Sequence, residues 1–272
     1  MNRKLLVLFF LTASLQHAWA QKYDVSINTG ATGYMGELNQ RNPFDFTRGG
    51  FGLSFRKNFN PDFSLKVNFN QLLLHADDAN SGVPEQVKRN LKFTSWVTEA
   101  SVQFEFNFFK FNPFDKRESY SPYIFAGVGV FHFNPYTFLD GHKVFLHDVG
   151  TEGQNLPGSQ QQNYYPRPYA RFSGCIPIGV GFKYHLGGHI SLVTEYGIRL
   201  TFTDYLDDVG GVYPDYTVNG TNTTLARLSN RSYYTYVPGD QRGDSWRYDK
   251  YFYGSVGIIY TFRSIDCPAF YK

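Results

Sequence analysis

Cysteine and methionine are scarce in this chain of 272 residues, which has 2 of each. Two cysteines cannot build the dense disulfide framework of a small secreted scaffold. The formal net charge is only +3, from 26 Lys and Arg against 23 Asp and Glu. Nucleic-acid binding requires a clustered basic face, so nucleic acid is excluded as a partner. No stretch approaches the roughly 18 uninterrupted apolar residues that a membrane-spanning helix requires.

Aromatic residues are abundant, with 27 Phe and 21 Tyr. The mean hydropathy is nevertheless negative, at −0.37. This aromatic content excludes a disordered chain. Together with 26 Gly, it favours strands and turns over helices.

The first 20 residues have the features of an export signal. Arg3 and Lys4 precede an apolar run over 5–13, and 18–20 (Ala-Trp-Ala) matches a signal-peptidase site. Gln21 follows the site in place of the cysteine that a lipoprotein anchor would need. We therefore expect a signal peptide over 1–20, a folded domain over 21–263 and a periplasmic tail over 264–272.

Apolar and polar residues alternate with period two in many segments, which predicts half-buried strands. In 100–108, Val102, Phe104 and Phe106 alternate with Gln103 and Glu105. Eight strands are expected, with no amphipathic helix; their approximate positions are 23–27, 51–55, 63–69, 100–108, 123–133, 176–184, 190–202 and 251–262.

The connections between these strands alternate between short and long. The short ones are 58–62, 110–121 and 187–189, and the long ones are 33–48, 76–92, 136–173 and 206–248. Short periplasmic turns and long extracellular loops are typical of outer-membrane barrels. The fold class predicted is all-β, an eight-stranded antiparallel transmembrane β-barrel in the cell outer membrane. A soluble barrel with its Phe faces inside remains the alternative, because alternation does not reveal which face is inner.

In a membrane barrel the aromatic faces would contact lipid and the polar faces would point inward. An eight-stranded barrel is filled by side chains. Buried charges persist mainly when they are paired, so we expect a paired interior network and not a path for solutes. The residues predicted for this network are Arg56, Lys66, Glu105, Lys183, Glu195 and Arg199. The aromatic residues expected in interfacial girdles include Tyr123, Phe133, Tyr184, Tyr205 and Tyr251.

An acidic cluster follows the seventh strand. Asp204, Asp207 and Asp208 are expected to fix the base of the 206–248 loop at the outer rim, paired with Arg242 or Arg231. A hard cation such as Ca²⁺ is the alternative, because it prefers carboxylate oxygens, although the spacing is not that of an EF-hand.

The sequence contains no recognisable motif for a catalytic, cofactor or metal site, and none is predicted. His132, His142 and His147 are irregularly spaced and lack paired cysteines. No serine lies in a nucleophile elbow, and the inward-facing His185 has no obvious serine partner. We therefore expect a protein that is not an enzyme, with no cofactor and no small-molecule substrate.

Several segments, in order along nearly the whole mature chain, resemble the PorG-type barrels of Bacteroidetes type IX secretion systems. The segments that carry the resemblance are 33–38 (GYMGEL), 89–93 (RNLKF), 121–129 (SPYIFAGVG), 133–135 (FNP), 150–154 (GTEGQ), 201–209 (TFTDYLDDV) and 241–244 (QRGD). This resemblance implies an outer-membrane barrel, in contact with membrane lipid, that anchors the periplasmic PorK/PorN (GldK/GldN) ring. Its partners would be the ring lipoprotein and the ring protein.

A ring partner would have to bind the periplasmic surface. The candidate docking residues are Lys110, Lys116, Arg117, Phe270 and Tyr271. The alternative from another functional class is a stand-alone receptor or adhesin that acts through the long loops 136–173 and 206–248. Co-purification of the ring lipoprotein would distinguish the two.

Overall fold

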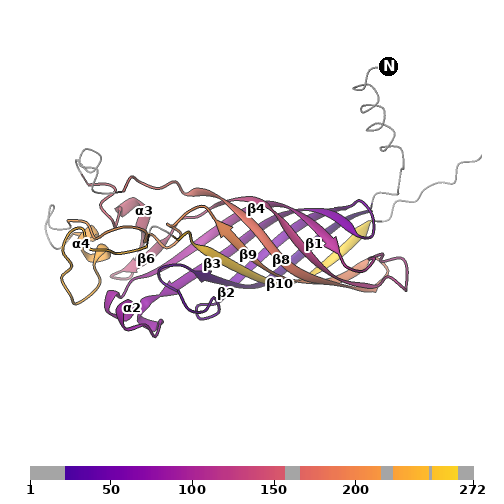
Figure 1. Ribbon diagram of the computed structural model, residues 1–272, viewed down its shortest axis with the longest axis horizontal. Helices are drawn as coiled ribbons and strands as arrows, with labels where there is room; N and C mark the ends of the chain where they lie inside the picture. The colour runs from indigo at the N-terminus through magenta and orange to yellow at the C-terminus, as the bar shows by residue number, and fades with distance from the viewer. Residues whose placement is uncertain (1–21, 157–165, 216–222, 245–246, 263–272) are drawn as a thin grey trace, which may run out of the picture.

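The computed structural model describes residues 22–156, 166–215, 223–244 and 247–262. The expected signal peptide and the tail with Phe270 and Tyr271 lie outside the described residues. Eight long strands form the body of the molecule (Figure 1). They are β1 (Lys22–Met35), β2 (Arg48–Asn58), β3 (Phe63–Asp77), β4 (Lys92–Asn107), β5 (Tyr120–His132), β8 (Phe172–Gly187), β9 (Ile190–Thr201) and β10 (Lys250–Phe262).

The eight strands close into a barrel. Each strand pairs antiparallel with its neighbours in the chain order, and the first and last strands pair as well, from Tyr23 opposite Phe262 to Met35 opposite Lys250. Closure leaves no sheet edge, so the ladder hydrogen bonds satisfy the backbone groups that lipid cannot. The predicted fold class is confirmed.

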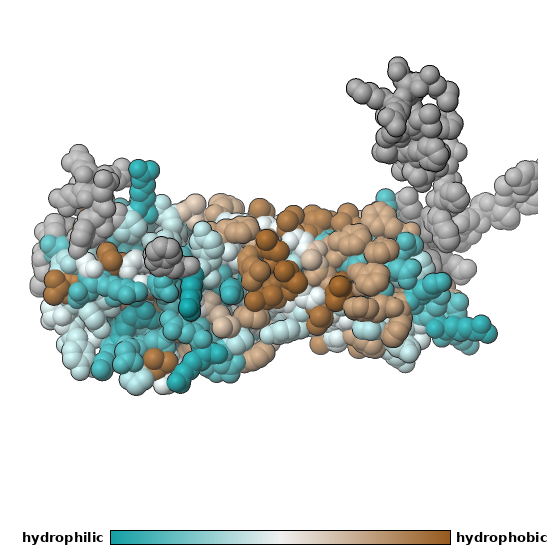
Figure 2. All heavy atoms as spheres, in the orientation of Figure 1, coloured by the Kyte–Doolittle hydropathy of each residue, from teal (hydrophilic) through white to brown (hydrophobic). Residues whose placement is uncertain are grey.

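The side chains of each strand alternate between an apolar outer face and a buried inner face. In β4, Phe104 is 48 % exposed and the neighbouring Glu105 is fully buried. Ile27 in β1 and Ile258 in β10 are likewise exposed. Figure 2 shows one side of the resulting apolar belt, which lies between two hydrophilic ends. The Phe faces are therefore outside, and the soluble alternative is wrong.

The loops separate by length at the two ends, as expected. Short connections follow β2, β4 and β8, and the long ones lie at the opposite end, where they build a cap (Figure 1). The cap contains short elements that the alternation did not predict: η1 (Asp78–Asn80), α2 (Pro84–Arg89), the hairpin of β6 (Tyr136–Leu139) and β7 (His142–Phe145), α3 (Leu146–Val149) and α4 (Thr224–Ser229). Among the described residues, no helix has the length and apolar character needed to span a membrane.

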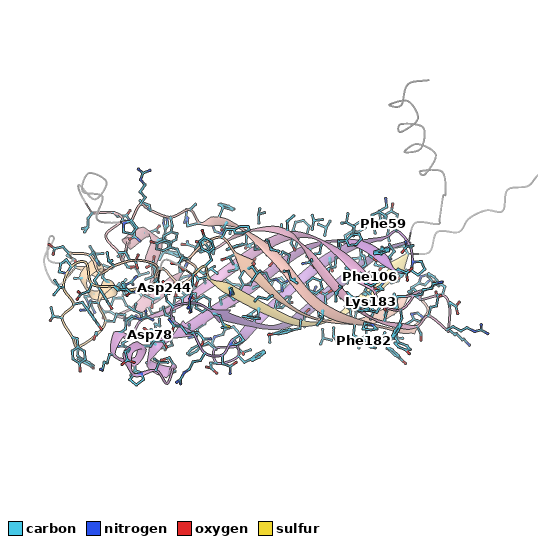
Figure 3. All side chains as sticks on the ribbon, viewed as in Figure 1. Phe59, Asp78, Phe106, Phe182, Lys183 and Asp244 are labelled. Atoms are coloured by element: carbon cyan, nitrogen blue, oxygen red, sulfur yellow. The ribbon has the colours of Figure 1, made fainter. Side chains whose placement is uncertain are left out.

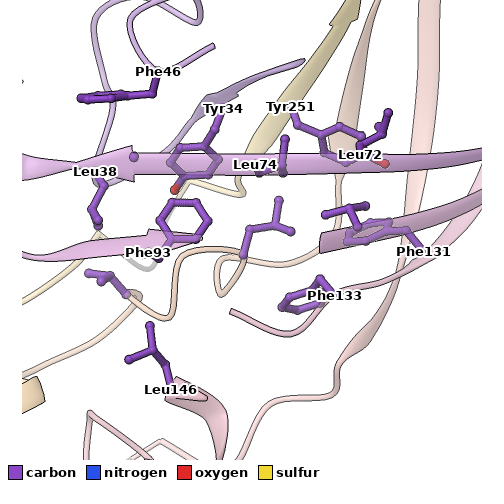
Figure 4. Packing of buried hydrophobic residues seen from close by; sticks show 14 of the residues in the cluster. Tyr34, Leu38, Phe46, Leu72, Leu74, Phe93, Phe131, Phe133, Leu146 and Tyr251 are labelled. Carbon is purple, nitrogen blue, oxygen red and sulfur yellow. The ribbon is translucent and has the colours of Figure 1, made fainter. Parts of the chain in front are cut away.

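The cap and the adjoining upper end of the barrel are packed around an apolar core. Leu72 and Leu74 of β3 and Phe93 of β4 meet Leu38 and Leu146 from the loops (Figure 4). The interior therefore changes along the barrel axis, from a charge network at the level of the apolar belt to an apolar core beneath the loops, which buried polar groups adjoin.

Three of the residues expected in interfacial girdles are instead inside the molecule. Tyr123, Phe133 and Tyr251 are each at most 1 % exposed, whereas Tyr184 is 46 % exposed and on the outer surface. The prediction for the first three was wrong because it placed aromatic residues in the girdles only on the ground that they lie near strand ends. Their place in the alternation puts them on the inner face.

Candidate functional site

The six charged residues predicted for the interior all lie inside the barrel, and five of them form one network near the short turns. Its centre is Glu105, which accepts hydrogen bonds from Arg56 Nε at 2.8 Å and Arg56 Nη2 at 3.0 Å. Lys183 Nζ lies 2.7 Å from Glu105 Oε2, and Lys66 Nζ lies 3.0 Å from Glu105 Oε1. Figure 3 places Lys183 at the same end as Phe59, in the turn after β2. A single carboxylate thus contacts three cations.

Two further carboxylates balance the charge of this network. Glu195 pairs with Lys66, and Asp24 lies 3.6 Å from Arg56. The network then holds three cations and three carboxylates. Sequence reasoning missed Asp24, although it occupies a polar position of the predicted first strand.

An inward glycine makes room for an aromatic member of the same network. A Cβ on Gly181 would lie 2.4 Å from Cζ of Tyr123, so only glycine allows this ring to lie against β8. The Tyr123 hydroxyl donates a hydrogen bond to Glu195 Oε1 at 2.5 Å. Lys183 Nζ lies 4.4 Å from the centre of the ring, in the geometry of a cation–π contact.

Arg199 belongs to a second interior layer, closer to the cap. Its Nε lies 3.1 Å from Glu99 Oε2, which also accepts a hydrogen bond from the Tyr251 hydroxyl at 2.8 Å. Sequence reasoning missed Glu99 because the predicted strand began one residue later, whereas β4 continues through it. The charged side chains of both layers are paired and, apart from the half-buried Glu195, fully buried, as expected of a structural network and not of a water-filled channel.

The acidic cluster at the outer rim closes the base of the loop after β9. Val209 N donates to Asp207 Oδ1 at 2.9 Å, and Leu206 N donates to Asp249 Oδ2 at 2.9 Å. The Tyr34 hydroxyl lies 2.6 Å from Asp207 Oδ2 and 2.7 Å from Asp249 Oδ1. Three segments distant in the sequence therefore meet at these two carboxyls.

Of the two arginines expected to pair with this cluster, Arg242 contacts it, but without an ion pair to the side chains of Asp204, Asp207 or Asp208. Arg242 Nη1 forms its ion pair with Glu152 at 2.9 Å and reaches Asp208 only through the backbone oxygen, at 2.7 Å. Arg231 donates to Thr137. The Asp208 side chain accepts hydrogen bonds from the Thr151 and Tyr169 hydroxyls. Its burial raises the pKa of this carboxyl to about 6.

Glu37 and Asp204 complete the acidic cluster. Carboxylate oxygens of Glu37, Asp207 and Asp249 lie within 4.8 Å of one another, and all three residues are buried. The Asp204 carboxyl lies against that of Glu37. Burial, followed by the neighbouring acidic groups, raises the pKa of Asp204 to about 9, and burial raises the pKa of Glu37 to about 7. Burial also raises the pKa values of Asp207 and Asp249 well above the ordinary range.

Among the described residues, no histidine belongs to a group of side chains close enough to share a metal ion. His185 Nδ1 lies 3.3 Å from the Ser191 hydroxyl, so the expectation that it has no serine partner was wrong. Ser191 is fully buried, and the hydrogen bonds found for His185 include no carboxylate. A nucleophilic triad requires both an accessible hydroxyl and an acid that orients the histidine.

The candidate docking residues Lys110, Lys116 and Arg117 are exposed on the connection between β4 and β5. This connection is ordered by backbone hydrogen bonds from Asn112 N to Glu118 O at 2.9 Å and from Phe111 N to Pro61 O at 3.2 Å. The three basic side chains are thus displayed at the short-turn end.

A closed barrel with an apolar belt, buried charges and loops sorted by end is a transmembrane β-barrel of the outer membrane. Residues 2–149 match the family described as a domain of unknown function, DUF6089. The match covers more than half of the chain, and the chain belongs to this family. A search of curated proteins finds no match.

Solved structures of small outer-membrane proteins are similar to this chain. Ail of Yersinia pestis, in complex with the heparin analogue sucrose octasulfate, is 12 % identical, with a TM-score of 0.43 over 90 % of this chain and 100 % of Ail. OprG of Pseudomonas aeruginosa is 11 % identical, with a TM-score of 0.39 over 90 % of this chain and 98 % of OprG. OmpW of E. coli is 12 % identical, with a TM-score of 0.37 over 91 % of this chain and 100 % of OmpW.

Proposed function

We propose that this protein is a non-enzymatic outer-membrane component of the type IX secretion system that anchors the periplasmic PorK/PorN (GldK/GldN) ring. The resemblance to PorG-type barrels, which continues in order along the mature chain, suggests the role. The observation that carries it is the filled interior: Arg56, Lys66 and Lys183 are at most 1 % exposed. A barrel filled in this way acts through its ends and not through a lumen.

The periplasmic end offers a surface suited to an acidic partner. Lys110, Lys116 and Arg117 are exposed and form no ion pair with any described residue. The turn that carries them is fixed against the neighbouring turn, where the Phe114 and His189 rings pack edge to face at 5.5 Å. A rigid basic surface loses little conformational entropy when a partner binds.

Reversal of these three charges tests the proposal. We expect the Lys110→Glu, Lys116→Glu, Arg117→Glu variant to insert normally and to lose most of the ring lipoprotein that co-purifies with the tagged wild-type barrel. A matched control reverses three exposed basic residues of the cap, through Arg41→Glu, Lys88→Glu and Lys143→Glu. Equal recovery of the ring with both variants, or no ring with the wild type, would contradict the proposal.

A surface receptor or adhesin is the second candidate, and the packed cap favours it. The loop that contains the β6–β7 hairpin is anchored at its base by Phe133 and Leu146, which are buried in the apolar core. This loop therefore has a defined shape. In this case the cap variant and not the periplasmic variant would lose binding to host cells or to an external ligand.

A further inference from the structure

The acidic cluster at the outer rim contains more carboxyl groups than its own residues can neutralise. Among the described residues, Glu37, Asp204, Asp207 and Asp249 form no ion pair with a lysine or arginine side chain. The nearest guanidinium groups are already paired, Arg89 with Asp78 at 2.8 Å and Arg242 with Glu152 at 2.9 Å. Carboxylates at this separation cannot all ionise without a proton or a cation between them.

Unpartnered oxygens point to a ligand in this cluster. Asp204 is 7 % exposed, and neither of its carboxylate oxygens receives a hydrogen bond from an N–H or O–H donor among the described residues; its carboxyl lies against that of Glu37, which is another acceptor. Glu37 is 4 % exposed, and its Oε2 is also unpartnered. Buried polar atoms are rarely left unsatisfied, and a bound ion is one of the ordinary explanations.

The position of Tyr34 gives an independent sign that a proton or a cation is missing from the cluster. Its hydroxyl is within hydrogen-bond distance of both Asp207 Oδ2 and Asp249 Oδ1. One hydroxyl has one proton, so it can donate to only one of the two carboxylates. The other oxygen then needs a different partner, either a proton shared with a neighbouring carboxyl or a cation.

We propose that Glu37, Asp204, Asp207 and Asp249 bind one Ca²⁺ ion, which joins the end of β1, the loop after β9 and the start of β10. All donors are oxygens, as hard cations require. Ca²⁺ accepts six to eight oxygens in flexible geometry, whereas Mg²⁺ keeps several waters and is seldom enclosed by protein ligands alone. The burial of the cluster therefore favours Ca²⁺.

This site would fix the loop base without any role in ring binding, so the proposal is independent of the proposed function. Gly36 lies between Tyr34 and Glu37, and a Cβ there would lie 1.9 Å from Asp249 Oδ1. The absence of a side chain at this position lets the chain approach the cluster closely.

The test uses the full-length barrel purified in detergent micelles and freed of metal with EDTA. We expect calorimetric titration with CaCl₂ to show one ion bound per barrel. Asp207→Asn with Asp249→Asn, and separately Glu37→Gln, should weaken binding by about tenfold or more, because affinity follows the charge of the ligands. Asp148→Asn, which changes an exposed carboxylate of the cap, is the matched control and should bind as the wild type does.

The outcomes separate the possible occupants. Absence of Ca²⁺ uptake by the wild type, or equal uptake by the double variant, would overturn the site and leave shared protons as the explanation of the cluster. Equal affinity for Mg²⁺ would overturn the choice of ion. If the double variant fails to fold, as judged by its heat-modifiable migration on gels, the Glu37→Gln variant decides the question.

Discussion

The interior of this barrel contains two groups of buried charges that differ in balance. In the network around Glu105, three cations meet three carboxylates and the side chains neutralise one another. In the cluster around Asp207, four carboxyl groups gather without a paired cation among the described residues. The network around Glu105 lies at the level of the apolar belt, where the outer side chains face lipid. The cluster around Asp207 lies at the other end of the barrel, beneath the hydrophilic cap.

The difference shows that the surroundings decide whether a buried carboxylate needs a basic side chain as its partner. Inside the membrane-spanning wall, an unpaired charge has no solvent to reach, so each acid there has a basic partner. At the rim, protons or a cation can enter from outside, so an excess of acids can persist. The same substitution, acid to amide, should therefore have opposite consequences in the two groups.

The largest effect is expected from Glu105→Gln. It leaves Arg56, Lys66 and Lys183 without their shared carboxylate, and removal of one partner of a buried ion pair costs about 3–5 kcal/mol. We expect a loss of this size in the free energy of unfolding, measured by urea titration in lipid bilayers. Glu85→Gln, at an exposed position of α2, is the matched control and should change the stability little.

Leu74→Ala tests whether the cap core is a separate stabilising unit. Leu74 is 1 % exposed in this core, and truncation of a buried leucine to alanine costs about 2–5 kcal/mol. Hydrogen exchange should become faster in the cap and remain unchanged at the level of Glu105. Phe104→Ala removes a larger side chain from the lipid face, where acyl chains can fill the space. A smaller loss from Leu74→Ala than from Phe104→Ala would argue against a separate core.

The pH dependence of the cap should distinguish the acidic cluster from the balanced network. The pKa of Asp204 is raised from 3.8 to about 9, so the folded cap holds a proton that the unfolded chain has lost between these values. Stability conferred by this group therefore falls as the pH rises through that interval. In EDTA we expect the cap to lose about 1–2 kcal/mol between about pH 7.5 and pH 9, measured by hydrogen exchange.

Asp204→Asn should flatten this pH dependence, because the amide cannot ionise, and should stabilise the cap at pH 9. Asp148→Asn should leave the pH dependence as it is. A wild-type cap that becomes more stable as the pH rises in EDTA would contradict the assignment of raised pKa values to this cluster.

The smallest effect is expected at the cap surface. Arg227 Nη1 pairs with Asp140 Oδ2 at 2.6 Å, and both side chains are exposed to solvent. Exposed ion pairs contribute little because water and salt screen them. Arg227→Ala should leave the urea midpoint within experimental error, and a clear shift would show that α4 depends on this pair.

The strands and the sorting of loops were predictable because period-two alternation and loop length are local properties. Phe104 and Glu105 fall on opposite faces wherever the strand lies. The interior network was partly predictable for the same reason, since an inward-facing charge in one strand requires an opposite charge in another. Glu99 was missed only because the predicted strand began at residue 100, whereas β4 begins at Lys92.

The sequence by itself therefore determined a barrel with alternating faces, its short and long connections and most of the charges inside it. Only the tertiary structure decided which face meets lipid, that an apolar core packs beneath the loops, and that Glu37 and Asp249 join Asp204 and Asp207. These facts depend on contacts between residues as far apart as Tyr34 and Asp249. Strand register and loop packing bring such residues together, and no local pattern encodes that proximity.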